Sequence, residues 1–390
     1  MRIGKIQEAL QETQLDGWLF FDHHHRDPLA YRILGLDAAL HASRRWYYFI
    51  PRAGEPRGLV HRIEAHVLDG LPGTMHEYSR WDEQTSGIEI LLSDSSRIAM
   101  QYSAKCAIPY VSMVDAGTVE LISALGVEVA SSADLVQMFE ACWSESQLQQ
   151  HLDAGKHVDA IRAEAFQLVA ERLRTGVSVD EWEIRCFIRS RFAEAGLSTD
   201  HGPIVAVNDN ASNPHYEPSQ EVHSLIRRDD LLLLDMWAKL DSPEAVYYDI
   251  TWTGFCGTAA PTEMVKVFDV VREARDRAVR RVQDAVESQA DLRGFEVDEA
   301  AREFITAQGM GEYFVHRTGH SIGTEVHGAG ANMDNFETHD DRRVIPWTCF
   351  SIEPGVYLPE FGIRSEVNVF VDAQRARVTG EIQTQLATLL

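Results

Sequence analysis

The segment His316-Arg-Thr-Gly-His-Ser-Ile-Gly-Thr-Glu-Val-His327 places three histidines among glycines in the last third of the chain. Glycine permits tight turns, so the segment favours a turn-rich loop over a regular helix. Part of it, Gly319-His-Ser-Ile-Gly323, also matches the G-x-S-x-G nucleophile elbow of serine hydrolases. That elbow requires a strand before the serine and a helix directly after it, whereas further glycines follow here. A serine hydrolase is therefore an alternative to a role in which the histidines bind a metal or a substrate.

Four carboxylates lie in segments of β-strand character on both sides of these histidines. They are Asp235, Asp249, Glu353 and Glu366. Any one of them alone is expected to be a solvated edge group or an ion-pair partner, but four together with His320 are harder to explain in this way. Buried carboxylates that lie close together repel one another unless they are protonated or bind cations. Oxygen-rich ligation with one imidazole suits manganese, cobalt, iron or zinc, and two such ions close together form a hydrolytic site.

The order Asp235, Asp249, His320, Glu353, Glu366 resembles the five-ligand set of the metallopeptidases that share the creatinase/aminopeptidase, or pita-bread, fold. This group includes methionine aminopeptidase, Xaa-Pro aminopeptidase and prolidase. Besides the histidine segment, the resemblance is carried by Gly294-Phe-Glu-Val-Asp-Glu-Ala-Ala-Arg302, Ser351-Ile-Glu-Pro-Gly-Val-Tyr357 and Gly362-Ile-Arg-Ser-Glu366. Asn213-Pro-His-Tyr216 is similar to the segment that supplies a substrate-binding histidine in the proline-specific branch.

Two features depart from the family pattern. Asp235 and Asp249 are 14 residues apart, more than is usual in the family, which predicts a longer hairpin through Asp241-Ser-Pro-Glu244. The segment before Glu353 reads Ile345-Pro-Trp-Thr-Cys349, where the family more often has a Pro-Gly pair. Neither departure removes a ligand, so both bear on the substrate pocket more than on the metal centre.

The resemblance implies two divalent metal ions, with manganese expected and cobalt, zinc or iron as alternatives. Asp249 would bind one ion through both oxygens, while Asp235 and Glu366 would bridge or chelate the pair. His320 and Glu353 would complete the second ion. A hydroxide bridging the metals would attack the scissile carbonyl, and Glu353 would transfer the proton to the leaving nitrogen.

The resemblance also implies which residues contact the substrate. His215 and His327 would donate hydrogen bonds to the developing oxyanion or to the substrate carbonyl. His316 would line the pocket for the residue after the scissile bond, although a structural hydrogen bond is the alternative for this histidine. Arg364 would orient Glu366 or pair with a substrate carboxylate.

The chain as a whole predicts an α/β (α+β) fold in two domains. Residues 1–142 resemble, more weakly, the smaller creatinase-like N-terminal α/β domain, and residues 143–390 resemble the pita-bread catalytic domain. A capping box formed by Ser144 and Gln147 opens a long helix, and Ser178 with Glu181 predicts the start of a second one. Strands are expected at residues 17–21, 46–50, 97–100, 231–235, 246–254, 350–357 and 363–371, and further helices at 114–125, 262–286 and 297–305.

Composition excludes several classes of protein. The 390 residues carry a net charge of −24, which argues against a nucleic-acid partner. We expect no membrane association, because no apolar run approaches the roughly 20 residues of a bilayer span and the N-terminus does not read as a signal peptide. Five widely spaced cysteines predict neither a disulfide framework nor a thiolate zinc site. We therefore expect a cytoplasmic protein and, by resemblance, a homodimer.

The leading hypothesis is a metallopeptidase that cleaves small peptides before proline, as an Xaa-Pro dipeptidase or aminopeptidase. The alternative is the same metal scaffold acting on a non-peptide amide or ring metabolite, as ectoine hydrolase does. A non-catalytic binding module is a remote third hypothesis, because relatives of that kind have lost ligands that this chain keeps. The run His23-His-His25 predicts a solvated loop, and a substrate contact from that loop stays open.

Overall fold

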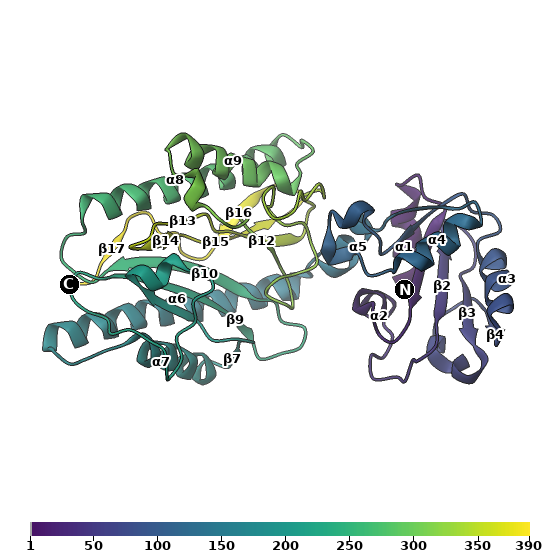
Figure 1. The fold of residues 1–390 in the computed structure, drawn as a ribbon, viewed down its shortest axis with the longest axis horizontal. Coiled ribbons are helices and arrows are strands. Elements are labelled where there is room, and N and C mark those ends of the chain that lie inside the picture. The colour runs from purple at the N-terminus through teal and green to yellow at the C-terminus, as the bar shows by residue number, and fades with distance from the viewer. Residues whose placement is uncertain (1) are drawn as a thin grey trace. The chain divides into compact units, whose positions relative to one another are not determined.

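The computed structural model describes residues 2–390, which divide into two compact units, Met1–Glu140 and Ala141–Leu390. The sequence predicts a boundary between residues 142 and 143. Each unit combines helices with its own sheets and its own hydrophobic core, so the predicted mixture of α and β structure is confirmed (Figure 1).

The N-terminal unit is built on one mixed sheet with the strand order β4-β3-β2-β1-β5-β6. The pairs β1–β5, β5–β6 and β3–β4 are parallel and the other two pairs are antiparallel, as the prediction of a partly parallel sheet requires. The strands are β1 (Gly17–Asp22), β2 (Trp46–Pro51), β3 (Arg57–His61), β4 (Thr74–Tyr78), β5 (Arg97–Met100) and β6 (Glu128–Ser131). The helices are α1 (Arg2–Gln11), α2 (Pro28–Leu34), α3 (Trp81–Leu91), α4 (Ala116–Ala124) and α5 (Ala133–Glu140), with short 3₁₀ turns at Arg62–Leu68, Ala104–Cys106 and Pro109–Val111.

The C-terminal unit holds two larger sheets and one short hairpin. One sheet contains β7 (Leu197–Ser198), β8 (Ile204–Val207), β9 (Leu231–Leu240), β10 (Tyr248–Phe255) and β17 (Ala387–Thr388). The other contains β11 (Ser321–Ile322), β12 (Thr348–Ile352), β15 (Val367–Val371) and β16 (Ala376–Thr379). The hairpin pairs β13 (Gly355–Tyr357) with β14 (Gly362–Arg364).

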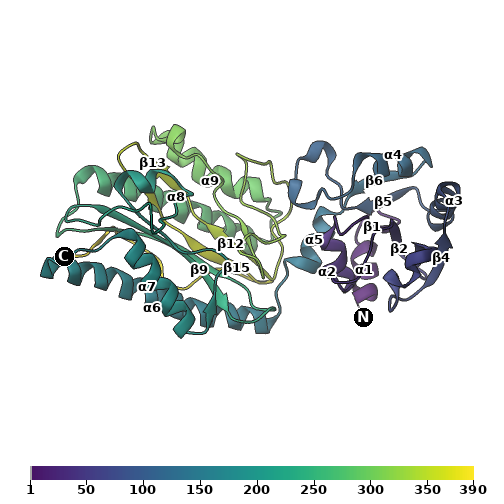
Figure 2. The ribbon, with the colours of Figure 1, turned by 60° about the horizontal axis from the view of Figure 1, so that its bottom comes forward.

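Two pairs of helices enclose these sheets. Helices α6 (Glu145–Thr175) and α7 (Glu181–Glu194) share a core with β9 and β10, whereas α8 (Thr262–Glu287) and α9 (Gly294–Ala307) share a core with β12 and β15. Figures 1 and 2 show the strands of this unit between the two helical layers. Short 3₁₀ turns occur at Asn208–Ser212 and Gly311–Tyr313. None of the helices in residues 2–390 has the length and apolar character that crossing a bilayer would need.

The structure corrects three details of the predicted elements. Helix α7 is capped by Asp180, whose side chain accepts from the Glu183 N–H at 2.8 Å, so the prediction that Ser178 caps this helix is wrong. The strand expected at 350–357 breaks at Glu353, because the following proline has no N–H for a ladder bond. The strand expected at 363–371 breaks between β14 and β15, which leaves Glu366 at the break.

Candidate metal centre

The first half of the candidate site lies on the β9–β10 hairpin. Asp235 lies opposite Thr251 in the antiparallel register, and Asp249 lies opposite Trp237. The two aspartates therefore occupy one face as diagonal neighbours, within reach of each other's side chains. Both are buried, with 8% and 4% of their surface exposed. The connection between the two strands spans residues 241–247, in agreement with the predicted long hairpin.

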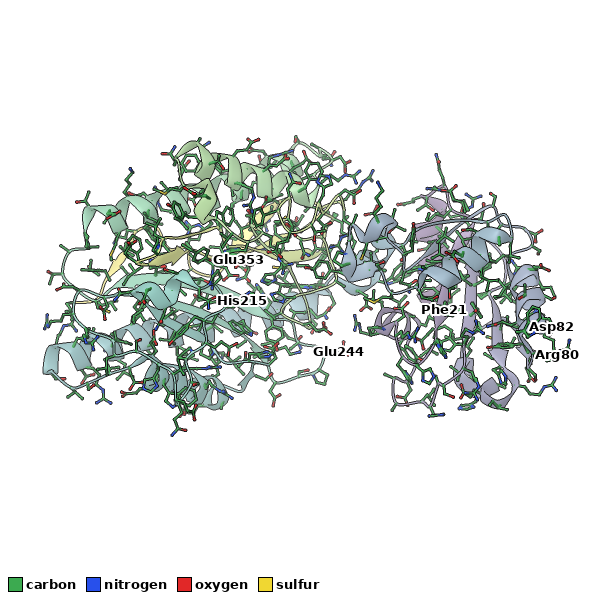
Figure 3. The ribbon with its side chains drawn as sticks, viewed as in Figure 1. Phe21, Arg80, Asp82, His215, Glu244 and Glu353 are labelled. Atoms are coloured by element: carbon green, nitrogen blue, oxygen red, sulfur yellow. The ribbon has the colours of Figure 1, made fainter. Side chains whose placement is uncertain are left out.

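The second half comes from segments more than 60 residues further along the chain. His320 immediately precedes β11, Glu353 immediately follows β12, and Glu366 lies between β14 and β15. The backbone N–H of Glu366 donates to the Thr251 carbonyl at 3.1 Å, which joins this half to the hairpin. Figure 3 shows Glu353 between the two helical layers, in the interior of the C-terminal unit.

Four of the five predicted ligands lie directly together. Asp249, His320 and Glu366 each offer a ligand atom, and these three atoms all lie within 4.8 Å of one another. His320 Nε2 is 3.5 Å from Asp249 Oδ2 and 3.4 Å from Glu353 Oε1. Asp235 is the fifth candidate ligand, and its carboxylate accepts from the Arg364 guanidinium. Arg364 is also 3.8 Å from Glu353 Oε2, so one buried cation connects both ends of the cluster.

The cluster carries more buried negative charge than the protein balances. Burial raises the pKa of Asp249 to about 7 and that of Asp235 to about 6. Burial, together with the charges of Asp249 and Glu353, raises the pKa of Glu366 well above its ordinary value. Among the described residues, Asp249 Oδ1 and Glu366 Oε1 are buried carboxylate oxygens that accept no hydrogen bond. Orphaned oxygens beside a neutral imidazole are the donor set that a divalent cation would satisfy, so the residues fit a metal centre.

The candidate ligands are fixed by further hydrogen bonds. Ser351 Oγ accepts from the His320 N–H at 3.0 Å and donates to Glu353 Oε1 at 3.2 Å. Thr251 Oγ1 donates to Glu366 Oε2 at 2.8 Å, and Asn368 Oδ1 accepts from the Asp249 N–H at 3.1 Å. These bonds orient the Glu353 and Glu366 carboxylates and fix the backbone at His320 and Asp249, as is usual around bound metals.

A hydrogen-bonded chain leads from the cluster to His316. Arg364 Nη1 donates to the Tyr357 hydroxyl at 3.0 Å, and that hydroxyl is 2.7 Å from His316 Nε2. Burial lowers the pKa of His316 to about 3, so this imidazole is neutral. The structure therefore brings Arg364 to the ligands directly, and His316 only through Tyr357.

The other two predicted histidines differ in their surroundings. The His327 ring packs edge-on against His320 with their centroids 4.4 Å apart. Partial desolvation and the charge of His320 lower the pKa of His327, although the residue as a whole is exposed. His215 is exposed on the loop after the 3₁₀ turn at 208–212, and no hydrogen bond joins its ring to a ligand in the described structure. Its charge nevertheless contributes to lowering the pKa of His327, which indicates that the two rings lie near each other.

The arrangement around Ser321 does not suit a nucleophile elbow. The preceding strand required by that motif is missing, because Ser321 itself begins the two-residue strand β11, and residues 323–334 contain no helix. The Ser321 hydroxyl is buried and accepts from the Gly330 N–H at 3.0 Å. Ser321 therefore has a structural role in the glycine-rich loop.

The sequence did not predict that Tyr357 and Thr251 contact Arg364. Tyr357 and Thr251 both meet Arg364, from positions 7 and 113 residues away in the chain. Alternation along β10 places Thr251 on the face of Asp249, which is the one signal that points to it. Tyr357 ends the Glu353-Pro-Gly-Val-Tyr segment, and nothing in its local sequence indicates that it would bridge an arginine and a histidine.

The comparisons with known proteins agree with this geometry. The model of metallopeptidase family M24 matches residues 153–373. The Xaa-Pro dipeptidase of Lactobacillus delbrueckii subsp. lactis is 31% identical over 241 residues, which cover 60% of this chain and 58% of that protein. The Xaa-Pro dipeptidase of Lactobacillus helveticus is 30% identical over 203 residues, which cover 52% of this chain and 50% of that protein. The chain thus spans little more than half the length of these curated relatives.

Solved structures share the fold across the whole chain. The dipeptidase PepE from Mycobacterium ulcerans matches with a TM-score of 0.69 and 20% identity, covering 100% of this chain and 97% of that one. The recombinant prolidase from Thermococcus sibiricus matches with a TM-score of 0.64 and 22% identity, covering 99% of this chain and 98% of that one. An X-prolyl aminopeptidase from Caenorhabditis elegans, described as a cytosolic enzyme with a di-nuclear active site, has a TM-score of 0.65 and 19% identity, covering 98% of this chain and 62% of its own. These matches confirm the predicted fold class, and with the family match they show that the chain belongs to metallopeptidase family M24.

Proposed function

We propose that this chain is a dinuclear metal hydrolase that cleaves the peptide bond before proline, as an Xaa-Pro dipeptidase or Xaa-Pro aminopeptidase. The observation that carries the proposal is the buried group of Asp249, His320 and Glu366, in which two carboxylate oxygens have no partner. The substrate class is supported by the names of the curated relatives, which include two Xaa-Pro dipeptidases.

We infer that five residues would hold the two cations. They are Asp235, Asp249, His320, Glu353 and Glu366. Manganese is our first choice, with cobalt, zinc or iron as alternatives. When bound, the ions would supply Lewis acidity and lower the pKa of water at the site.

Glu353 is the residue that we expect to move a proton. Its Oε1 faces His320 at 3.4 Å and receives a hydrogen bond from Ser351, while its Oε2 is 3.8 Å from Arg364. These contacts fix both oxygens of a side chain that is 15% exposed, so the carboxylate can meet water and substrate from one side only. A carboxylate held in this way could accept a proton and return it to the leaving nitrogen of the cleaved bond.

The remaining predicted residues would bind the substrate. His327, packed on His320, and His215, on the exposed loop, would donate hydrogen bonds to the carbonyl oxygen as negative charge develops there. His316 would line the pocket for the residue after the scissile bond. Arg364 was predicted to orient Glu366 or to pair with a substrate carboxylate. Because its guanidinium contacts Asp235, Thr251 and Tyr357, we propose that it orients Asp235 instead. The homodimer remains a prediction from the family resemblance, and the cytoplasmic location remains one from the composition and cysteine usage.

The test is proline release from an Ala-Pro dipeptide and an Ala-Pro-Ala tripeptide. The protein is first stripped with a chelator and then assayed before and after manganese is added. Release that depends on added metal supports the proposal, and the preferred peptide distinguishes dipeptidase from aminopeptidase. Asp249→Asn, measured for metal content and activity together, serves as the control that should lose both. A protein that binds two metals and releases no proline would overturn the peptidase and favour a non-peptide amide or ring substrate.

A further inference from the structure

A large open pocket in the N-terminal unit has three arginines and three histidines among its lining residues. Its volume is about 890 Å³ and it is formed by the loops that follow β1, precede β2 and follow β4, together with the start of α4. We call it the arginine pocket and define it by Arg26, Arg44, Arg45, His23, His24 and His61. Phe21, labelled in Figure 3, lies at its buried side. Pockets of this size are typical of small-molecule sites.

The arginines of this pocket have no carboxylate partner. Among residues 2–390, no acidic oxygen lies within 4.0 Å of the guanidinium of Arg26, Arg44 or Arg45. The Arg44 guanidinium donates to the hydroxyl of its neighbour Ser43 at 2.9 Å, and the backbone carbonyl of Arg45 accepts from the Tyr78 hydroxyl at 2.8 Å. All three arginines are exposed and none forms an ion pair within the described part of the chain, although the charge of Arg26 helps to lower the pKa of Asp115.

The acids around the pocket are already engaged. Asp115 is the one carboxylate among the described lining residues, and it caps α4 by accepting from the Thr118 N–H and hydroxyl at 3.0 and 2.8 Å. Glu64 lies behind the pocket and accepts from the backbone N–H groups of Ser43 and Arg44 at 2.9 and 2.8 Å. Asp22 holds the turn after β1 through the His25 N–H at 2.9 Å. These carboxylates shape the loops that carry the arginines, and none of them forms an ion pair with those arginines.

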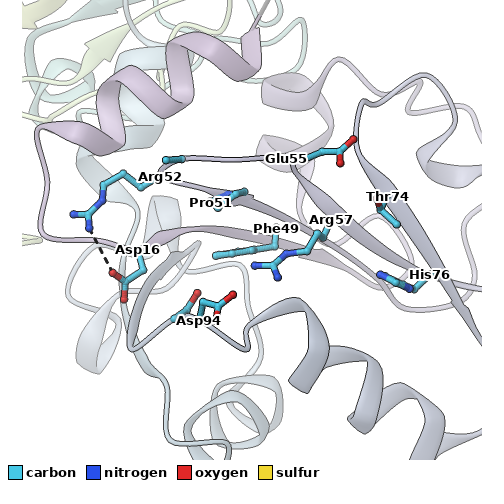
Figure 4. Close-up of a pocket in the computed structure, with 11 residues that line it drawn as sticks. Asp16, Phe49, Pro51, Arg52, Glu55, Arg57, Thr74, His76 and Asp94 are labelled. Carbon is cyan, nitrogen blue, oxygen red and sulfur yellow. Dashed lines mark ion pairs between the residues drawn. The ribbon is translucent and has the colours of Figure 1, made fainter.

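Positive charge here is exceptional for this chain. The whole protein has a net charge of −24, so an uncompensated basic pocket does not follow from its composition. A second cavity of the same unit, of about 530 Å³, provides the contrast. There Asp16, Glu55 and Asp94 offset Arg52 and Arg57, and Arg52 pairs with Asp16 (Figure 4).

The pocket also offers an aromatic surface. Trp81, the first residue of α3, lines the pocket and is 78% exposed. The indole is therefore accessible to a ligand that enters the pocket. A planar ring could stack on this indole while an anionic group of the same ligand meets the guanidinium groups.

We propose that the arginine pocket binds a phosphorylated small molecule that carries a planar ring, with the size and charge of a nucleotide. Guanidinium groups match phosphate oxygens through paired N–H donors, and three of them suit a phosphate better than a single carboxylate. The pocket contains none of the candidate metal ligands, because its lining residues all come from the N-terminal unit.

The experiment is isothermal titration of the full chain with AMP, ATP, inorganic pyrophosphate and citrate at low ionic strength. The proposal expects saturable binding of a nucleotide that is tighter than binding of pyrophosphate or citrate. Replacing both Arg44 and Arg45 by glutamine should weaken that binding by about tenfold or more, and Arg26→Gln should act in the same direction. Trp81→Ala should reduce nucleotide affinity while leaving pyrophosphate affinity unchanged.

The matched control is Arg80→Gln. Arg80 is exposed, neighbours Trp81 and pairs with Asp82, and it does not line the pocket (Figure 3). Its loss changes the net charge by the same amount as Arg26→Gln, and nucleotide affinity should stay within about twofold of the wild type. Absence of saturable nucleotide binding, equal binding of citrate, or an equal effect of Arg80→Gln would each overturn the proposal.

Discussion

Glu181 is the residue whose replacement tests the architecture around the candidate site most directly. It lies at the start of α7, is fully buried, and accepts hydrogen bonds from four groups outside its own helix. The donors are the Val207 N–H at 2.8 Å, the Ser224 N–H at 2.7 Å, the Tyr216 hydroxyl at 2.6 Å and the Asn210 amide at 2.9 Å. These donors surround the exposed loop that carries His215, so one carboxylate organises both ends and the middle of that loop.

The size of the effect follows from the number of donors that lose their acceptor. A hydrogen bond to a charged group contributes about 1.5–3 kcal/mol, and a buried donor left without an acceptor costs about 1–3 kcal/mol. Glu181→Gln keeps one carbonyl oxygen and should lower the free energy of unfolding by about 2 kcal/mol. Glu181→Ala removes all acceptors, and although water can reach some of the half-buried donors, we expect a loss of about 4 kcal/mol. The contributions are not additive, because the four donors share one carboxylate.

The assay combines urea unfolding with kinetics on a proline-containing dipeptide. If the loop positions His215 for the substrate, Glu181→Gln should lower kcat/KM by about tenfold without changing the bound metal, because no metal ligand is touched. The matched control is Glu183→Gln, two residues further along α7, where the half-exposed pair with Arg172 contributes about 0.5 kcal/mol at most. Unchanged stability and unchanged kcat/KM in Glu181→Gln would refute the reasoning, and so would equal effects of the two variants.

The remaining predictions concern the metal, the alternative nucleophile and one buried histidine. Chelation should lower the apparent free energy of unfolding, because the clustered carboxylates lose the cations that bind only the folded state, and added manganese should restore it. An unfolding midpoint that changes with neither treatment would contradict a metal centre. Ser321→Ala should keep its metal and most of its turnover and lose about 1 kcal/mol of stability with the Gly330 hydrogen bond, whereas an inactive, metal-loaded variant would favour the serine hydrolase. Burial lowers the pKa of His151 to about 4, and its nitrogens contact the Tyr247 carbonyl and the Thr379 hydroxyl. The neutral imidazole therefore stabilises the fold fully above the unfolded pKa of about 6.5. About 3 kcal/mol of that stability should be lost as the pH falls from about 6.5 to about 4. Urea unfolding of His151→Asn should lack this pH dependence.

Local sequence patterns predicted the elements that depend on short-range physics. The predicted strand Arg97–Met100 and the capping box of Ser144 with Gln147 both match the structure. Both depend on residues close in sequence: a short apolar run, and two polar side chains three residues apart that bond to each other's backbone N–H groups. Glu181 shows where this logic stops. Its spacing from Ser178 fits a capping box, yet its carboxylate is used by a loop up to 43 residues away, and Asp180 caps the helix instead. Tertiary contacts with that loop decide whether Glu181 serves in a capping box or as an acceptor for the loop, and these contacts cannot be predicted from the local sequence.

The candidate site shows the same division. The five ligand positions could be named in advance only because their motifs resemble a known family, since each carboxylate alone has a plausible structural role. The contacts of Arg364 could not be named, because its partners Asp235 and Thr251 lie more than 100 residues away in the chain. Strand alternation identifies which residues share a face, but it cannot identify which residues of another segment will meet that face.

The broken strands at Glu353 and Glu366 connect these two observations. A continuous strand alternates its side chains between two faces, so only every second residue can point into the site. A break in the ladder frees the backbone to re-aim one side chain, at the expense of the local ladder bonds. Glu353 and Glu366 lie at two such breaks, beside His320 and the β9–β10 hairpin, and they bring negative charge to one buried point. In continuous strands the same carboxylates would be spread along the sheet. The cost is visible in Asp249 Oδ1 and Glu366 Oε1, which accept no hydrogen bond from the described residues, and a bound cation would offset it.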